Sequence, residues 1–145
     1  MERNFDFLSS VELLFEGKIV DLHNNYGLVA CIVSFDEKKV TLKFESVYPV
    51  DNDKQEDRPV SIELAAVNNI DMHVDRLLQG LAYESIEDIA FKPPGDTDLS
   101  WLLNANQASD GDDIVFLLTD GEYIRVGAGS CTLIPASKPT LISHQ

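Results

Sequence analysis

The chain has 145 residues, of which 44% are hydrophobic and 8% aromatic, and its 25 acidic and 11 basic side chains give a formal charge of −14. A chain of this length buries about 68–70% of the surface that its unfolded form exposes, so a core can form without metal or disulfide bonds. The negative charge disfavours nucleic acid and anionic membrane surfaces as partners and favours a cation, above all a basic protein.

The first predicted element is a short helix over residues 9–15. Ser9 and Glu12 have the spacing of a capping box, and Gly17 is placed to end the helix. We expect the apolar residues of this helix to pack on the core.

An antiparallel hairpin is predicted after this helix. Residues 27–35 form an almost continuously apolar run, which is typical of a central strand covered on both faces. The polar residues 36–39 turn the chain. Apolar and polar residues then alternate, which predicts a strand with one exposed face, and its apolar positions are Val40, Leu42 and Phe44.

The middle of the chain mixes predicted loop, strand and helix. Residues 51–59 are polar and predict an exposed loop, and the alternation at residues 60–64 predicts a strand beyond it. A helix is predicted over residues 71–81, where apolar residues recur at helical spacing. Residues 85–91 fit neither template well, so both structures stay open for them.

The last third of the chain holds the clearest local pattern. The two successive prolines within residues 92–96 predict a loop. Two apolar runs flank Asp120 and Gly121, a pair that tolerates the positive φ angles of a two-residue type I′ turn, so residues 114–126 predict a hairpin. A further strand is expected at residues 132–134.

These elements predict a single α+β domain over residues 1–135, followed by a loose polar tail over residues 136–145. Its centre is expected to be a mainly antiparallel, twisted sheet of about six or seven strands built from hairpins, with one or two short helices on one face.

A cytoplasmic location is predicted. Residues 1–4 lack the basic flank and apolar segment of an export signal, and the longest apolar run, residues 27–33, is too short to cross a bilayer. Cys31 and Cys131 lie among apolar residues, so in a reducing compartment we expect two buried free thiols.

No template for catalysis, cofactor binding or metal binding is satisfied. The Gly-Ala-Gly-Ser-Cys segment at residues 127–131 lacks the order of a nucleophile elbow and the Lys-Ser/Thr pair of a phosphate-binding loop, which indicates a bulge or sheet corner. The acidic loops lack the positions of a calcium-binding EF-hand. His23, His73 and His144 lack zinc-ligand spacing. We expect no metal and no cofactor.

The acidic residues concentrate between residues 84 and 122. This stretch contains ten acidic residues and one basic residue, Lys92, and so contributes −9 to the net charge. The only tryptophan lies in the same stretch, and tryptophan is enriched among interface anchors. The alternative is that the indole fills the core and that residues 110–113 form a solvated turn. We predict one exposed partner-binding surface made of Asp96, Asp98, Trp101, Asp110, Asp112 and Asp113.

In overall character the chain resembles the small acidic immunity proteins with which bacteria neutralise polymorphic and contact-dependent growth inhibition toxins. The shared features are size, acidity, β-hairpins, acid-rich loops and the lack of a catalytic motif. Those proteins share no single fold, so the resemblance transfers no residue roles. It implies a stoichiometric inhibitor that docks on a basic, often nuclease, toxin through electrostatic attraction.

Two other functions are compatible with the sequence. One is a small enzyme with an unrecognised pocket that uses His23 or His73 as its base. The other is a subunit of a larger assembly, in which another chain completes the edge of the sheet.

Overall fold

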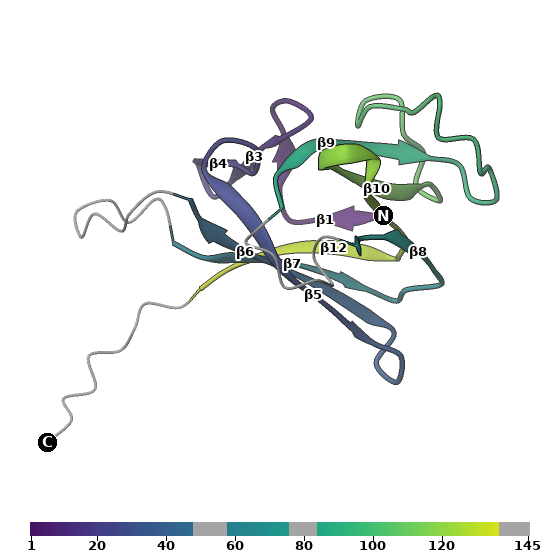
Figure 1. Cartoon of the computed structure of the whole chain (residues 1–145), viewed down its shortest axis with the longest axis horizontal. Helices are drawn as coiled ribbons and strands as arrows, with labels where there is room; N and C mark the ends of the chain where they lie inside the picture. The colour runs from purple at the N-terminus through teal and green to yellow at the C-terminus, as the bar shows by residue number, and fades with distance from the viewer. Residues whose placement is uncertain (48–57, 76–83, 137–145) are drawn as a thin grey trace, which may run out of the picture.

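The computed structural model describes residues 1–47, 58–75 and 84–136, which form an almost entirely β structure (Figure 1). The predicted α+β class is therefore wrong, because helical residues among those described are limited to Asp75 and one 3-10 turn at Thr119–Gly121. No described helix is long and apolar enough to span a membrane. The strands are β1 (Glu2–Arg3), β2 (Asp6–Phe7), β3 (Glu12–Phe15), β4 (Lys18–Asp21), β5 (Tyr26–Ser34), β6 (Lys39–Ser46), β7 (Val60–Ala65), β8 (Asn69–His73), β9 (Ile86–Lys92), β10 (Asp113–Leu118), β11 (Tyr123–Gly127) and β12 (Ser130–Pro135).

The strands form three sheets rather than the single sheet expected. Sheet A has the order β1-β12-β7-β6-β5, sheet B the order β2-β3-β4, and sheet C the order β8-β11-β10-β9. All neighbours are antiparallel except β1, which runs parallel to β12. Asn4 follows β1 and forms two hydrogen bonds with the backbone of Leu133 in β12, so the two segments are joined twice.

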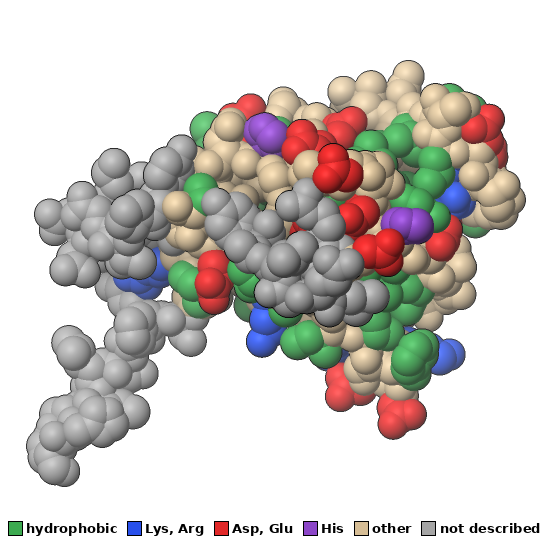
Figure 2. All heavy atoms as spheres, viewed as in Figure 1, with side chains coloured by type: hydrophobic (Ala, Val, Ile, Leu, Met, Phe, Trp, Pro, Cys, Tyr) green, Lys and Arg blue, Asp and Glu red, His purple; other side chains and the backbone are tan. Residues whose placement is uncertain are grey.

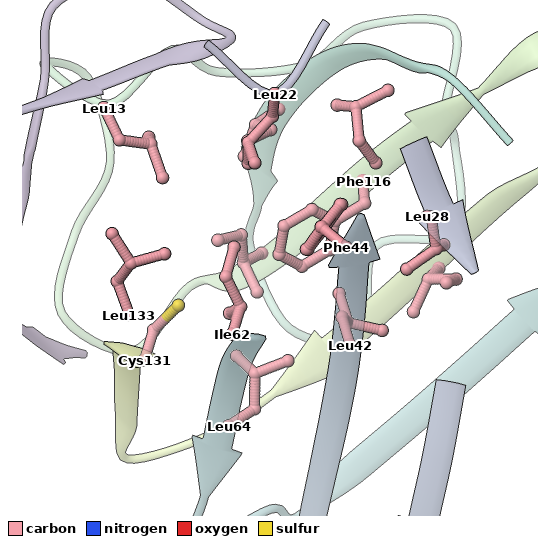
Figure 3. Close-up of a cluster of buried hydrophobic side chains, with 14 of the residues drawn as sticks. Leu13, Leu22, Leu28, Leu42, Phe44, Ile62, Leu64, Phe116, Cys131 and Leu133 are labelled. Atoms are coloured by element: carbon pink, nitrogen blue, oxygen red, sulfur yellow. The ribbon is translucent and has the colours of Figure 1, made fainter. Parts of the chain in front are cut away.

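One hydrophobic core lies between the sheets. Alternation sends Val40, Leu42 and Phe44 of β6 inward from sheet A, while Phe116 of β10 and Ile124 of β11 point inward from sheet C. Side chains of sheet B, among them the fully buried Leu13, close the core from a third side. Figure 3 shows Phe44 and Phe116 among the buried side chains near its centre.

The alternating patterns were the reliable ones. Both predicted hairpins are confirmed: β5 pairs with β6, and β10 pairs with β11. Asp120 and Gly121 have the predicted positive φ angles of 62° and 77°, although four residues rather than two lie between β10 and β11. The predicted strands at residues 60–64 and 132–134 are confirmed as β7 and β12, and residues 85–91 belong mostly to strand β9.

The predicted helix over residues 9–15 is wrong. The Ser9 hydroxyl accepts hydrogen bonds from the N–H groups of Val11 and Glu12, as a helix cap would. However, the Leu8 N–H donates to the Glu12 carbonyl, which closes a hairpin between β2 and β3. A serine hydroxyl that accepts hydrogen bonds from the N–H groups two and three residues later can stabilise a turn as well as the start of a helix.

The predicted helix over residues 71–81 is wrong for residues 71–73, although Asp75 is helical. Residues 69–73 form β8, which pairs along its whole length with β11. The apolar residues at helical spacing begin at Val74, after the end of β8, so the prediction began the helix too early. The remainder of the helix, most of the loop at residues 51–59 and the tail at residues 137–145 lie outside the described residues.

Strand β5 is at the edge of sheet A and not at its centre as predicted. Only Tyr26, Gly27 and Leu28 are buried, and farther along the strand Ile32 is 48% exposed. Phe35, just beyond the strand, is 82% exposed. Continuous apolarity therefore reflects one buried end and one apolar surface, rather than cover on both faces.

Residues 127–131 form a sheet corner, as predicted. The chain crosses from sheet A to sheet C after β7 and returns after β11, and the two crossings touch: the Asn68 N–H donates to the Gly127 carbonyl at 2.8 Å. A Cβ atom on Gly127 would meet Asn68 and would lie 2.6 Å from the Asp113 carboxylate. The corner therefore requires a residue without a side chain at position 127.

We predict that Gly127→Ala lowers the free energy of unfolding by about 1–3 kcal/mol, because the added methyl forces a packed corner apart. Gly111→Ala is the matched control: its Cβ would meet nothing within 4 Å, so its effect should stay within about 0.5 kcal/mol. Urea unfolding of both variants measures the difference, and equal stabilities would contradict the corner argument.

The two cysteines are free thiols, as expected, but only Cys131 is fully buried. Burial raises the pKa of Cys131 to about 12. Cys31 is half-buried in β5, where its sulfur lies 3.7 Å from that of Met72, and burial raises its pKa to about 11. Both thiols are therefore protonated at neutral pH.

These pKa values predict slow thiol chemistry in the native chain. At pH 8 the rise in the Cys31 pKa from 9.0 to about 11 lowers the thiolate fraction about 100-fold. We expect Ellman's reagent to modify Cys31 about 100-fold more slowly in the folded chain than in 8 M urea, and Cys131 more slowly still. Rapid native labelling of either thiol would refute the assigned environments.

Candidate functional site

The residues that carry the predicted surface surround the outer face of sheet C. Alternation turns Lys92, Asp113 and Arg125 of the three strands β9, β10 and β11 toward this outer face, away from the core. The loop that joins β9 to β10, residues 93–112, folds back along β9, where Phe91 and Leu103 exchange two backbone hydrogen bonds. We call this segment the acidic loop.

Arg125 is the centre of this arrangement. Its Nε donates to the Asp113 carboxylate at 2.8 Å, and its two terminal nitrogens donate to the backbone carbonyls of Pro93 and Asp96. Arg125 is 4% exposed and Asp113 1% exposed, so this is a buried ion pair. The planar guanidinium thereby fixes the start of the acidic loop against sheet C.

Lys92 anchors the same loop at Trp101. The Lys92 ammonium is fully buried, donates to the Trp101 carbonyl at 2.9 Å and lies 3.0 Å from the centre of the indole ring. It also lies 3.6 Å from the Asp96 carboxylate. A buried ammonium needs such partners because removal from water is costly. The indole itself is 44% exposed, so Trp101 does not fill the core.

The structure divides the six predicted surface residues. The prediction that all six share an exposed surface is wrong for Asp112 and Asp113, which are 7% and 1% exposed. Asp113 belongs to the ion pair with Arg125, and the Asp112 carboxylate accepts the Ser109 N–H and closes a turn. Both carboxylates therefore bond to groups within the protein and are not exposed to a partner.

The other three acids differ in their positions. Asp96 is half-buried and faces Lys92, while Asp98 is exposed two residues along the same loop. The Ser100 hydroxyl and N–H donate to the Asp98 carboxylate and lower its pKa, so it stays ionised. Asp110 is exposed near Met1, whose amino group donates to the Asp110 carbonyl. Asp96, Asp98 and Trp101 form one site around Lys92, and no contact among the described residues joins Asp110 to them.

Acidic side chains are not confined to this loop. Figure 2 shows Asp and Glu over most of the visible face rather than in one patch. Charged side chains of both signs are buried: Lys92 and Arg125 are two of the eight basic residues in the described parts of the chain, and the buried acids are Glu84, Asp112, Asp113 and Glu122. Burial therefore removes more acidic than basic side chains from the surface.

The histidines do not form an acid and base pair. The Nδ1 atom of His23 lies 2.8 Å from the Ile86 carbonyl, which can only accept, so this nitrogen carries the proton. Ser85 approaches the same nitrogen and therefore cannot transfer its proton to it. His73 stacks on Tyr123 and lies 3.6 Å from Asp75, and no hydrogen bond or ion pair among the described residues links it to His23. His144 lies outside them.

Sequence reasoning missed Lys92 and Arg125, the two residues that organise the site. Lys92 was visible as the one base in the acidic stretch, and Arg125 as the one charge inside the apolar strand that follows the Asp-Gly turn. A single charge in a strand pattern usually faces water, so neither position indicated burial. Within the described segments no three potential ligands gather to hold a metal ion.

Loss of the buried ion pair should be costly. We predict that Asp113→Asn lowers the free energy of unfolding by about 3–5 kcal/mol, because the shape is kept while Arg125 loses its counter-charge. Asp110→Asn removes an exposed carboxylate from the same loop and should change stability by less than about 0.5 kcal/mol. Chemical denaturation measures both variants, and a small effect at Asp113 would show that the pair does not hold the loop.

No protein-family model, no curated protein and no solved structure matches the chain.

Proposed function

We propose that the chain is a cytoplasmic immunity protein that binds and neutralises a basic toxin domain, and that Trp101 with Asp96 and Asp98 forms the contact site. The observation that carries the proposal is the half-exposed indole fixed on a buried cation inside an acidic loop. Asp112 and Asp113 take no part in the contact, because both are buried.

A preorganised anchor suits a binding module. Tight interfaces depend on a few aromatic side chains, and ordering such a side chain on binding costs affinity. Trp101 avoids part of that cost, because Lys92 holds both its ring and its backbone carbonyl before any partner arrives. Trp101 is 44% exposed, so part of the indole is accessible to a partner.

The charge of the site favours a basic partner. Asp98 stays ionised beside the indole, and the nearest cation, Lys92, is fully buried beneath it. Together with a net charge of −14, this surface attracts cationic proteins and speeds their encounter at low salt. The same field repels the phosphates of nucleic acid, so a nuclease bound here would be separated from its substrate.

The test uses the protein encoded immediately upstream of the chain as the probe, with the two co-expressed and their affinity measured by biolayer interferometry. We expect Trp101→Ala to weaken binding at least about 30-fold, as loss of a central aromatic anchor does. Asp98→Lys should slow association, most strongly at low salt.

Asp36→Lys is the matched control, because Asp36 is exposed in the turn between β5 and β6, in a different sheet. It changes the net charge by as much as Asp98→Lys does. No binding of the probe would contradict the proposed function. Equal effects of the two charge reversals would keep a role for net charge and refute the Trp101 site.

A further inference from the structure

A cavity of about 550 Å³ opens between sheet B and one end of sheet A. The turn that joins β3 to β4 forms one wall, and the start of β7 and the end of β12 form the other. In Figure 1 these elements lie at the opposite end of the molecule from the acidic loop. No lining residue of the cavity belongs to the proposed partner site.

The inner part of the cavity is apolar. Val20 of β4, Val60 of β7 and Leu133 of β12 contribute to its lining and are buried. The Tyr26 hydroxyl donates to the Arg58 carbonyl at 2.8 Å, which ties the entry of β7 to β5 beside the cavity. Cavities of 300–1,000 Å³ with mostly apolar walls are typical of small-molecule sites.

The lining of the cavity holds more basic than acidic side chains. Lys18 and Arg58 belong to its lining, against one acid, Glu16. This excess of cations is unusual in a chain with 25 acids and 11 bases. Beside the mouth, Ile19 is 57% exposed, so apolar surface continues outward past the charged groups.

We propose that this cavity binds a free medium-chain alkyl carboxylate, with the chain among Val20, Val60 and Leu133 and the carboxylate between Lys18 and Arg58. The apolar walls favour a hydrocarbon body, and the two cations in the lining favour an anionic head. The same two residues disfavour a ligand with a positive head. This binding activity is independent of the proposed toxin-binding function.

Isothermal titration calorimetry with hexanoate, octanoate and decanoate below their micelle concentrations tests the apolar part. Each added methylene that enters the cavity should tighten binding about fourfold. Decanol and decylammonium test the head group. We expect decanoate to bind more tightly than decanol and decylammonium most weakly, although the net charge of the protein attracts cations in general.

Lys18→Gln and Arg58→Gln should each lower the affinity for decanoate and leave that for decanol unchanged. Lys43→Gln is the matched control, because Lys43 is exposed in β6 outside the cavity lining and its loss changes the net charge equally. Lys18 is exposed, so its replacement should not perturb folding, which thermal unfolding of each variant checks.

The proposal is overturned if decanoate and decanol bind equally, if decylammonium binds best, or if Lys43→Gln weakens decanoate binding as much as Arg58→Gln. It is also overturned if the protein binds vesicles of phosphatidylglycerol but no free decanoate, since the surface would then contact membranes. A fourfold gain per methylene together with loss of decanoate binding in Lys18→Gln supports it.

Discussion

The arrangement of this protein depends on the burial of two cations, Lys92 and Arg125, on the outer face of sheet C. A buried charge is tolerated only when its hydrogen bonds and counter-charge are supplied by the protein. The acidic loop supplies them through the Pro93 and Asp96 carbonyls and the Trp101 ring and carbonyl. The need to solvate two cations therefore determines where the loop lies and how its indole is presented.

The same requirement links distant parts of the chain. The carboxylate that balances Arg125 belongs to Asp113, which also accepts the Asn69 side-chain amide and leaves no space for a side chain at Gly127. The ion pair, the loop and the crossing between sheets A and C are thus neighbours that depend on one another. A change at any of these positions should affect the proposed binding surface, even where the changed residue is buried.

The sequence predicted local pairing well and global placement poorly. Alternation at residues 60–64 and the Asp120–Gly121 turn identified strands because these patterns act within a few residues. The helix predictions were wrong over residues 9–15, where the capping serine belongs to a turn, and over residues 71–73, which pair with β11. The buried state of Asp113 depends on Arg125, twelve residues away, and nothing in the local pattern indicates that contact.

The parallel pairing of β1 with β12 places the last strand of sheet A between the first strand and β7. During translation, residues 2–3 must wait for residues 130–135 to leave the ribosome before they find their partner. Until then the inner edge of β7 is unpaired and exposed to other nascent chains, a state that favours aggregation. A pairing between residues so far apart in the sequence predicts slow folding for a domain of this size.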